Sequence, residues 1–278
     1  MDKFYKKIIE AKQKEAREIR RGFSEQILKA AAYSVGGEVR SLEVDIREAR
    51  AFPVFVEIKS ILFLRGKSKP EFLKIEGFNP VRAVKELERA GLGGGVVVST
   101  DRDFLGGDPG WINLVKNNSA LAVMQRDFFV DPVQFYQGKA IGADAFLISA
   151  AFAEERVLPG LISAGGEMGL EVYLEIEESR LPAAVNPEDL SGVVMNFFPP
   201  DSGELQVNDF AGAVRALPGN LLKIARMNPR TPGDLTFLKE LGMQALILAD
   251  EFWQSADFLS RFQRINSWCN EVFPKGRN

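Results

Sequence analysis

Histidine is absent from the 278 residues of this sequence, and Cys269 is the single cysteine. Without histidine there can be no Ser-His-Asp triad, no Cys-His pair and no histidine-ligated metal, so acid–base chemistry falls to Asp, Glu, Lys, Tyr or Cys. One cysteine excludes an internal disulfide and, with no histidine, argues against a zinc site. We therefore expect a cytoplasmic protein without a metal centre.

Long apolar runs and basic patches are missing as well. No run of about 18 apolar residues offers a membrane span, and charged residues interrupt the N-terminus too often for a signal peptide. The net charge of −3 argues against nucleic acid as a partner. There is no Walker loop, and the glycines at 93–95 lead into an apolar run, whereas those of a dinucleotide fingerprint follow a strand.

Short apolar runs are present from residue 51 onwards, alternating with longer amphipathic stretches. Runs that are apolar throughout are typical of strands buried on both faces, as in a parallel sheet. The eight runs are 52–59, 95–100, 121–127, 143–149, 170–177, 192–196, 222–226 and 245–250.

Several of the intervening stretches begin with a helix-capping residue followed by proline, which is a helix-start signal. These starts are Asn79-Pro80 before 81–90, Asp131-Pro132 before the stretch to 140, and Thr231-Pro232 before the stretch to 241, which Gly242 closes. Eight strand–helix repeats predict a closed (β/α)8 barrel, for which about 250 residues is typical. The alternative is an open doubly wound sheet, which more often has fewer strands and a glycine-rich first turn.

The first fifty residues lie outside this alternation. Residues 2–21 form an amphipathic pattern with interleaved lysines and glutamates, and 37–47 predict a second short helix. A charged helix of this kind either packs on the barrel, which we favour, or contacts a membrane or partner. No linker divides the chain, so we expect one domain, 1–278, with a helical extension at 1–50 and the barrel at 51–278.

Polar residues end the predicted strands, where barrels of this type build their active sites. Glu57 and Lys59 share one face of the first strand, and Glu175 and Glu177 share one face of the fifth. Charges inside apolar strands must be paired or functional, because burying a lone charge is costly. Glu57, Lys59, Glu175 and Arg126 form either a structural ion-pair cluster or a site for an anionic substrate with its own acid and base.

The phrases around these strand ends resemble those of indole-3-glycerol-phosphate synthases over nearly the whole chain. Residues 125–136 (QRDFFVDPVQFY) are similar to the family's R-K-D-F-I-x-D-x-x-Q-x-Y, and 100–107 (TDRDFLGG) to T-D-x-x-x-F-x-G-G. Residues 56–59 (VEIK), 78–80 (FNP) and 142–145 (GADA) resemble A-E-x-K, F-D-P and G-A-D-A.

The resemblance implies a ring-closing decarboxylation in tryptophan biosynthesis. The substrate would be 1-(2-carboxyphenylamino)-1-deoxyribulose 5-phosphate, a small anionic aromatic molecule, and no cofactor would be needed. Carried over by position, the catalytic residues are Glu57, Lys59, Arg126, Glu175 and Asn196. The substrate-binding residues are Phe104, Arg226, Met227 and Asp250. We expect a monomer or a weak homo-oligomer, without nucleic acid or membrane as partner.

The sequence departs from the family at the ligand end. Arg126 replaces a lysine and can grip a carboxylate, but arginine is a poor proton donor. The family's phosphate-binding S-P-S-x-G, S-E-S-G-I and G-E-S phrases align with 60–65, 225–229 and 249–251, where apolar or acidic residues such as Met227 and Asp250 stand. Two hypotheses stay open: a divergent synthase or related carboxy-lyase, and a barrel that binds a changed, unphosphorylated ligand or has no catalytic role.

Overall fold

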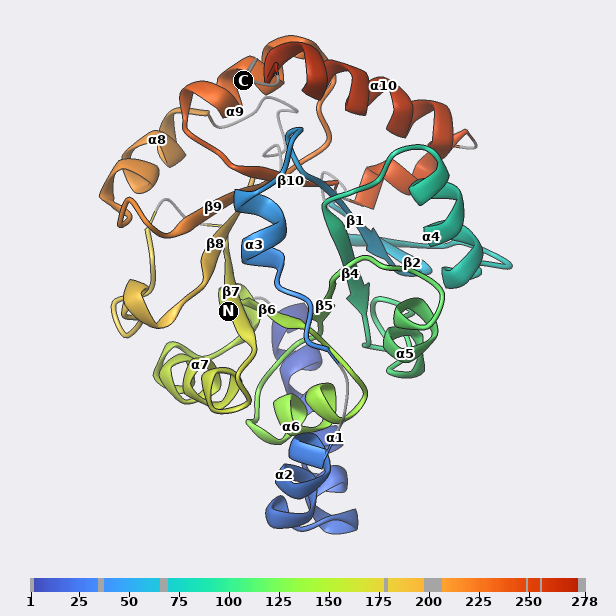
Figure 1. Ribbon diagram of the computed structural model, residues 1–278. Coiled ribbons are helices and arrows are strands. Elements are labelled where there is room, and N and C mark those ends of the chain that lie inside the picture. Colours follow the sequence, from blue (N-terminus) through green and yellow to red (C-terminus); the bar gives the residue numbers. More distant parts are fainter. Residues whose placement is uncertain are drawn as a thin grey trace.

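The computed structural model describes residues 3–34, 38–65, 70–177, 180–197, 207–248, 250–255 and 257–274. Eight parallel strands close into a barrel in which each strand pairs with the next barrel strand along the chain (Figure 1). The strands are β1 (Val54–Ile58), β4 (Gly95–Ser99), β5 (Val123–Arg126), β6 (Ala145–Ser149), β7 (Glu171–Ile176), β8 (Gly192–Asn196), β9 (Leu222–Arg226) and β10 (Ala245–Leu248). All eight lie within the predicted apolar runs, so the predicted closed barrel is confirmed.

Helices follow most strands and surround the barrel. They are α4 (Pro80–Arg89), α5 (Gly110–Lys116), α6 (Val133–Ala140), α7 (Leu158–Glu167), α8 (Val207–Ala216), α9 (Pro232–Glu240) and α10 (Phe258–Val272). Asn79 caps α4 as predicted, because its side chain accepts the Arg82 N–H at 2.9 Å. At α6 the cap lies one residue later than predicted, at Pro132, although Asp131 still accepts the Val133 N–H.

In one of the eight predicted strand–helix repeats, the described residues form no α-helix. Between β7 and β8 the described residues form only the short 3-10 helix η3 (Pro187–Asp189). Pro182 and Pro187 lie in this connection, and proline in a helix interior removes a backbone hydrogen bond and clashes with the preceding turn. These prolines disfavour an α-helix in this connection.

An antiparallel hairpin, absent from the sequence-based prediction, follows β1. It pairs β2 (Ile61–Arg65) with β3 (Pro70–Lys74). The Ile61 N–H donates to the Leu105 carbonyl at 3.0 Å, so the hairpin is tied to the loop after β4. Only Lys59 and Ser60 separate β1 from β2, and neither glycine nor proline marks a turn between them, which explains why the second strand was missed.

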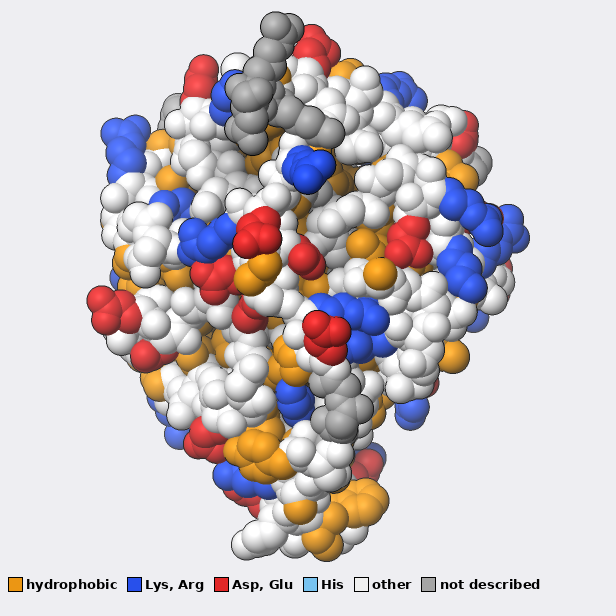
Figure 2. Space-filling model, in the orientation of Figure 1, with side chains coloured by type: hydrophobic (Ala, Val, Ile, Leu, Met, Phe, Trp, Pro, Cys, Tyr) orange, Lys and Arg blue, Asp and Glu red, His pale blue; other side chains and the backbone are white. Residues whose placement is uncertain are grey.

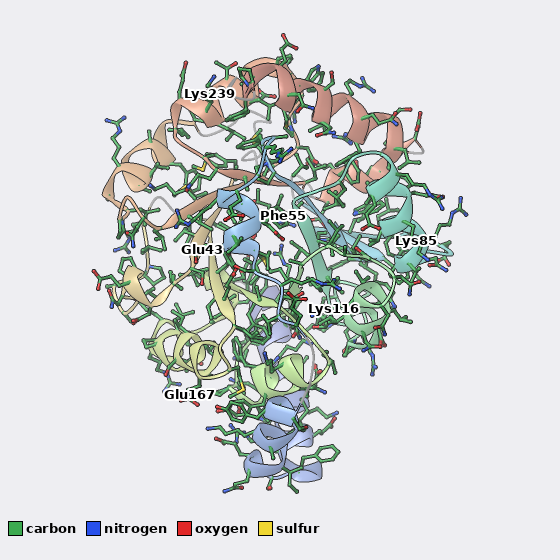
Figure 3. The ribbon with its side chains drawn as sticks, in the orientation of Figure 1. Glu43, Phe55, Lys85, Lys116, Glu167 and Lys239 are labelled. Atoms are coloured by element: carbon green, nitrogen blue, oxygen red, sulfur yellow. The ribbon has the colours of Figure 1, made fainter. Side chains whose placement is uncertain are left out.

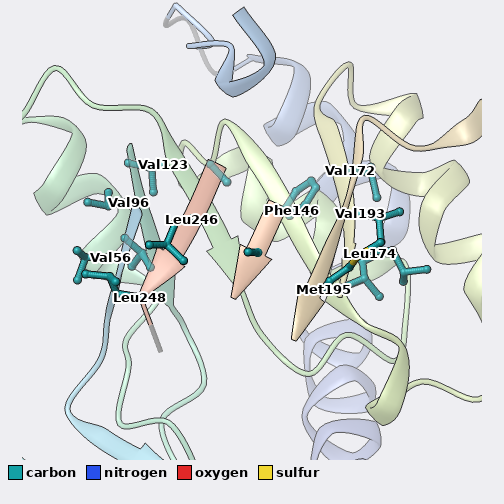
Figure 4. Close-up of a cluster of buried hydrophobic side chains, with 14 of the residues drawn as sticks. Val56, Val96, Val123, Phe146, Val172, Leu174, Val193, Met195, Leu246 and Leu248 are labelled. Carbon is teal, nitrogen blue, oxygen red and sulfur yellow. The ribbon is translucent and has the colours of Figure 1, made fainter. Parts of the chain in front are cut away.

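Two hydrophobic layers hold the barrel, because alternate side chains of a strand point to opposite faces. Outward-facing residues such as Val56, Phe146 and Leu174 belong to the layer that packs against the helices (Figure 4). Inward-facing residues such as Phe55 and Tyr173 fill the barrel interior. The same alternation directs the polar residues at the strand ends inward or outward.

The N-terminal extension contains three helices: α1 (Lys3–Gly22), α2 (Glu25–Ser34) and α3 (Leu42–Arg47). The prediction of a single second helix at 37–47 was wrong: α2 was missed, and α3 begins at Leu42 after the capping side chain of Ser41. Leu42 and Ile46 join Phe55 in the inner layer, so α3 closes the amino-terminal end of the barrel (Figures 1 and 3). The division into a 1–50 extension and one barrel domain stays a prediction.

The surface carries charges of both signs, interspersed over the face seen in Figure 2. Apolar side chains gather at the end of the molecule that α2 forms, where Phe23 and Ile27 are exposed. Among the described residues, no helix combines the length and the hydropathy that crossing a bilayer demands.

Candidate active site

Seven of the nine predicted site residues converge at the carboxyl ends of the strands. Their positions are Glu57 in β1, Lys59 just after it, Arg126 at the end of β5, Glu175 in β7, Asn196 and Arg226 at the ends of β8 and β9, and Asp250 at the start of the 3-10 helix η4 (Asp250–Gln254). All seven are buried. Glu57 shares the parity of Phe55 along β1 and therefore points into the barrel.

Glu57 lies at the centre of this charged cluster. Its carboxylate accepts hydrogen bonds from Ser99 Oγ at 2.7 Å, Arg226 Nη2 at 2.8 Å and Arg126 Nη1 at 3.3 Å. Lys59 Nζ lies 3.4 Å away. Trp253 donates its indole N–H to the Glu57 backbone carbonyl at 2.7 Å, which fixes the strand end beneath the carboxylate.

Glu175 and Asp250 are the other carboxylates of the cluster. Arg126 Nη2 contacts Glu175 at 2.7 Å, and Asn196 donates its amide N–H to the same carboxylate at 2.8 Å. Arg226 Nη2 reaches Asp250 at 3.2 Å, and Lys59 Nζ forms an ion pair with Asp250 as well. Each cation thus bridges two or more carboxylates across the barrel mouth.

The charges of the cluster balance among the described residues: three cations, Lys59, Arg126 and Arg226, face the carboxylates of Glu57, Glu175 and Asp250. Burial alone would raise the pKa of Glu57, but the nearby cations outweigh it and hold that pKa well below its ordinary value. The carboxylates around Arg226 likewise overcome burial and raise the pKa of its guanidinium. Glu57 is therefore ionised and unsuited to donating a proton.

The two remaining predicted site residues lie outside this cluster. Met227 is buried in the layer between strands and helices, because it follows the inward-facing Arg226. Phe104 packs edge-on against Phe128 with ring centroids 6.1 Å apart, in a small cluster that also contains Phe152. Their role in substrate binding stays a prediction.

Two groups that contact Glu57 were not among the nine predicted site residues. Ser99 shares the inward parity of Val97 on β4, so alternation along the strand could have identified it. Trp253 had no comparable signal, since it lies in a helical turn after β10. In the described part of the chain, no group of three or more acidic or cysteine side chains is arranged to hold a metal ion.

A closed barrel with buried cations and carboxylates gathered at the carboxyl ends of its strands has the architecture of (β/α)8-barrel enzymes. The family model for indole-3-glycerol phosphate synthase matches residues 5–188, which is more than half of the chain. The chain belongs to the indole-3-glycerol phosphate synthase family.

Relatives of the same name match at modest identity. The indole-3-glycerol phosphate synthase of Caldanaerobacter subterraneus subsp. tengcongensis is 28% identical over 179 residues, covering 64% of this chain and 68% of the relative. That of Chlorobium phaeovibrioides is 24% identical over 271 residues, covering 96% of this chain and 99% of the relative.

Solved structures share the fold at lower identity. The orotidine 5'-phosphate decarboxylase of Pyrococcus horikoshii OT3 superimposes with a TM-score of 0.53 at 11% identity, over 79% of this chain and 99% of that structure. A structure described as native KDPGal gives a TM-score of 0.52 at 12% identity, over 80% and 94%. These likenesses show the barrel fold alone.

Proposed function

We propose that this chain is a carboxy-lyase that converts 1-(2-carboxyphenylamino)-1-deoxyribulose 5-phosphate to indole-3-glycerol phosphate in tryptophan biosynthesis. Membership of the synthase family supports this reaction. The observation that carries it is the pairing of Arg126 with Glu175 at 2.7 Å, beside Lys59, at the carboxyl end of the barrel. A carboxylate-binding cation, a base and a proton donor are thereby assembled in one place.

The roles follow from the chemistry of each side chain. Ring closure needs a proton for the ketone oxygen, and the reaction then releases carbon dioxide and water. Arginine hardly gives up its proton, so Arg126 binds the substrate carboxylate and Lys59 donates the proton. Arg126 has the most exposed side chain of the three cations, at 10% against 1% for Lys59 and 2% for Arg226, and so offers the first contact to an entering anion.

Glu175 serves as the base in this scheme, and Asn196 is the group that orients it. The Asn196 amide N–H holds one Glu175 oxygen at 2.8 Å, while Arg126 contacts the other at 2.7 Å. A substrate carboxylate that binds Arg126 competes with Glu175 for the guanidinium and so frees a Glu175 oxygen. This oxygen accepts the proton that a ring carbon loses when the hydroxyl on the adjacent carbon leaves as water. A cytoplasmic location and a small phosphorylated substrate belong to the same proposal.

Indole fluorescence during incubation with the synthase substrate tests the proposal directly. We expect product from the unsubstituted protein and a loss of at least about 100-fold in kcat for Lys59→Ala and Glu175→Gln, the size typical of acid–base groups. Lys85→Ala is the matched control, because Lys85 is exposed on α4 and its ammonium donates to the Asn118 side chain at 2.9 Å, away from the charged cluster. No product at high protein concentration would rule out the synthase reaction, and undiminished turnover of Lys59→Ala would rule out its assigned role.

A second candidate function is binding of an unphosphorylated ligand, and the charge balance of the cluster favours it. The described cations of the cluster are all engaged by carboxylates, and Asp250 adds a negative charge near the last loops, where barrels of this kind hold phosphate. A thermal-shift comparison of phosphorylated and unphosphorylated aromatic acids separates the two functions. Stabilisation by unphosphorylated acids alone would support this candidate, and stabilisation by the phosphorylated ligand would support the synthase.

A further inference from the structure

Lys12 of α1 is a buried lysine outside the charged cluster. Its ammonium lies 2.7 Å from Asp127, 2.9 Å from Asp101 and 2.8 Å from Glu15. The Lys12 side chain is 3% exposed, and those of Asp101 and Asp127 are 2% and 7% exposed. Burying a lysine with two aspartates is costly unless the geometry is good and the remaining polar atoms are satisfied.

The two aspartates that bind Lys12 also shape the loops after β4 and β5. Asp101 accepts the backbone N–H groups of Phe104 at 2.6 Å and Leu105 at 2.9 Å. Asp127 accepts the Phe128 N–H at 2.7 Å and the Thr100 hydroxyl at 2.6 Å. The Thr100–Asp127 hydrogen bond joins the ends of the two neighbouring strands, and the Lys12 ammonium bridges the carboxylates of Asp101 and Asp127.

The neighbours of these aspartates in sequence belong to the charged cluster. Arg126 directly precedes Asp127 and contacts Glu57 and Glu175, and Ser99 lies two residues before Asp101 and donates to Glu57. Arg126 and Asp127 are consecutive at the end of β5, so their side chains point to opposite sides, and Lys12 binds the Asp127 carboxylate on the side away from Arg126. Asp101, which Lys12 also binds, lies just beyond Ser99 in the loop after β4. A displacement of either strand end would move the groups that contact Glu57.

We propose that Lys12 is a positioning residue of the active site, which makes α1 a functional part of the barrel mouth through its ion pairs with Asp101 and Asp127. The kinetic test of this proposal rests on the proposed function, because it measures turnover of the synthase substrate. Lys12 touches no group of the charged cluster, so it acts on substrate through Arg126 and Ser99. Loss of its charge leaves two buried carboxylates without their cation, and the loops that start at Asp101 and Asp127 then rearrange.

The test compares Lys12→Met with Arg20→Met. Arg20 also ties α1 to the barrel, through Asp131 at 2.6 Å, but it is half-exposed and contacts neither strand end. For Lys12→Met we expect kcat to fall by about 10- to 100-fold with little change in KM, as for misplaced catalytic groups. For Arg20→Met we expect unchanged kcat. Equal losses in both variants would overturn the proposal, because docking of the helix would then be what matters.

A second readout does not depend on turnover. Hydrogen exchange followed by mass spectrometry reports the amides of Phe104, Leu105 and Phe128, which donate to the two aspartates. We expect these amides to lose protection in Lys12→Met and to keep it in Arg20→Met. Unchanged protection in Lys12→Met would overturn the proposal. If the unsubstituted chain makes no indole product, the proposed reaction fails while the exchange experiment still decides the role of Lys12.

Asp101→Asn covers the case in which Lys12→Met does not fold. This change keeps a side-chain oxygen for the Phe104 and Leu105 amides and replaces the charged oxygen that faces Lys12 with an uncharged amide NH2 group. We expect a folded protein with a smaller fall in kcat, of about threefold to tenfold. Unchanged kcat in this variant would contradict the proposal.

Discussion

Arg226 and Glu57 pair at 2.8 Å although they belong to β9 and β1, which are separated by β10 in the barrel. The contact crosses the interior of the barrel mouth, and Arg226 extends it to Asp250 and Glu175. One side chain thus holds carboxylates from three different parts of the barrel. Removing it leaves charges that are buried and only partly compensated.

Arg226→Met is therefore expected to destabilise the protein by about 3–5 kcal/mol, because breaking a buried ion pair strands its partner charges. Urea unfolding followed by circular dichroism measures the loss. Arg82→Met is the control: this arginine pairs with Glu86 at 2.8 Å but its side chain is 77% exposed, and such pairs contribute below about 1 kcal/mol. Similar losses in the two variants would contradict a stabilising role of the cluster.

The contribution of Glu57 to the free energy of unfolding depends on pH. The pKa of Glu57 in the folded protein lies well below the ordinary value because the neighbouring cations outweigh burial. A lowered pKa stabilises the folded state above the unfolded value of about 4.3, and this stabilisation is lost as the pH falls through the folded pKa. We expect the stability difference between the unsubstituted protein and Glu57→Gln to shrink below pH 4.3, by at most about 1.4 kcal/mol per pH unit.

Urea midpoints at several pH values between 3 and 7 give this difference. Glu10→Gln changes a carboxylate that is 64% exposed on α1 and provides the comparison. A difference between the unsubstituted protein and Glu57→Gln that stays constant to pH 3 would show that the cations do not stabilise the ionised Glu57.

The fold could be predicted because strands buried on both faces are apolar throughout, and each run marked one barrel strand. Helix α2 was missed for a physical reason: Ile27 and Tyr33 are exposed while Leu28 and Ala32 are buried, so its apolar residues do not segregate to one face. The absent helix between β7 and β8 was signalled by Pro182 and Pro187, but the regular alternation elsewhere outweighed that signal.

The part of the site that lies at the ends of the strands could be predicted from the sequence. Glu57, Lys59, Arg126 and Glu175 lie together as expected, since parallel strands bring their carboxyl ends to one edge. The partners of Arg226 could not be predicted, because they depend on distances across the closed barrel. Lys12 was hidden among the exposed lysines of α1, and its burial follows only from how that helix lies on the barrel.

At the opposite, amino-terminal end of the barrel, the packing of Leu42 against the barrel interior contributes to the stability of the protein. Leu42 is fully buried against the inner layer, so Leu42→Ala is expected to cost about 2–5 kcal/mol through the cavity it leaves. Val44→Ala on the same helix, where the side chain is 48% exposed, should change stability by less than about 0.5 kcal/mol. Thermal unfolding measures both. Equal effects would mean that α3 does not close the barrel.

Cys269 makes stability depend on alkaline pH. Cys269 lies on the buried face of α10, and this burial raises the pKa of its thiol from 9.0 to about 12. A raised pKa stabilises the folded state below the unfolded value, and this contribution is lost as the pH rises from 9 towards 12. Between pH 8 and 10.5 the unsubstituted protein should lose about 2 kcal/mol relative to Cys269→Ala, which has no thiol to ionise. Urea unfolding at the two pH values measures this change, and an unchanged difference would mean that the thiol ionises as readily in the folded protein as in the unfolded chain.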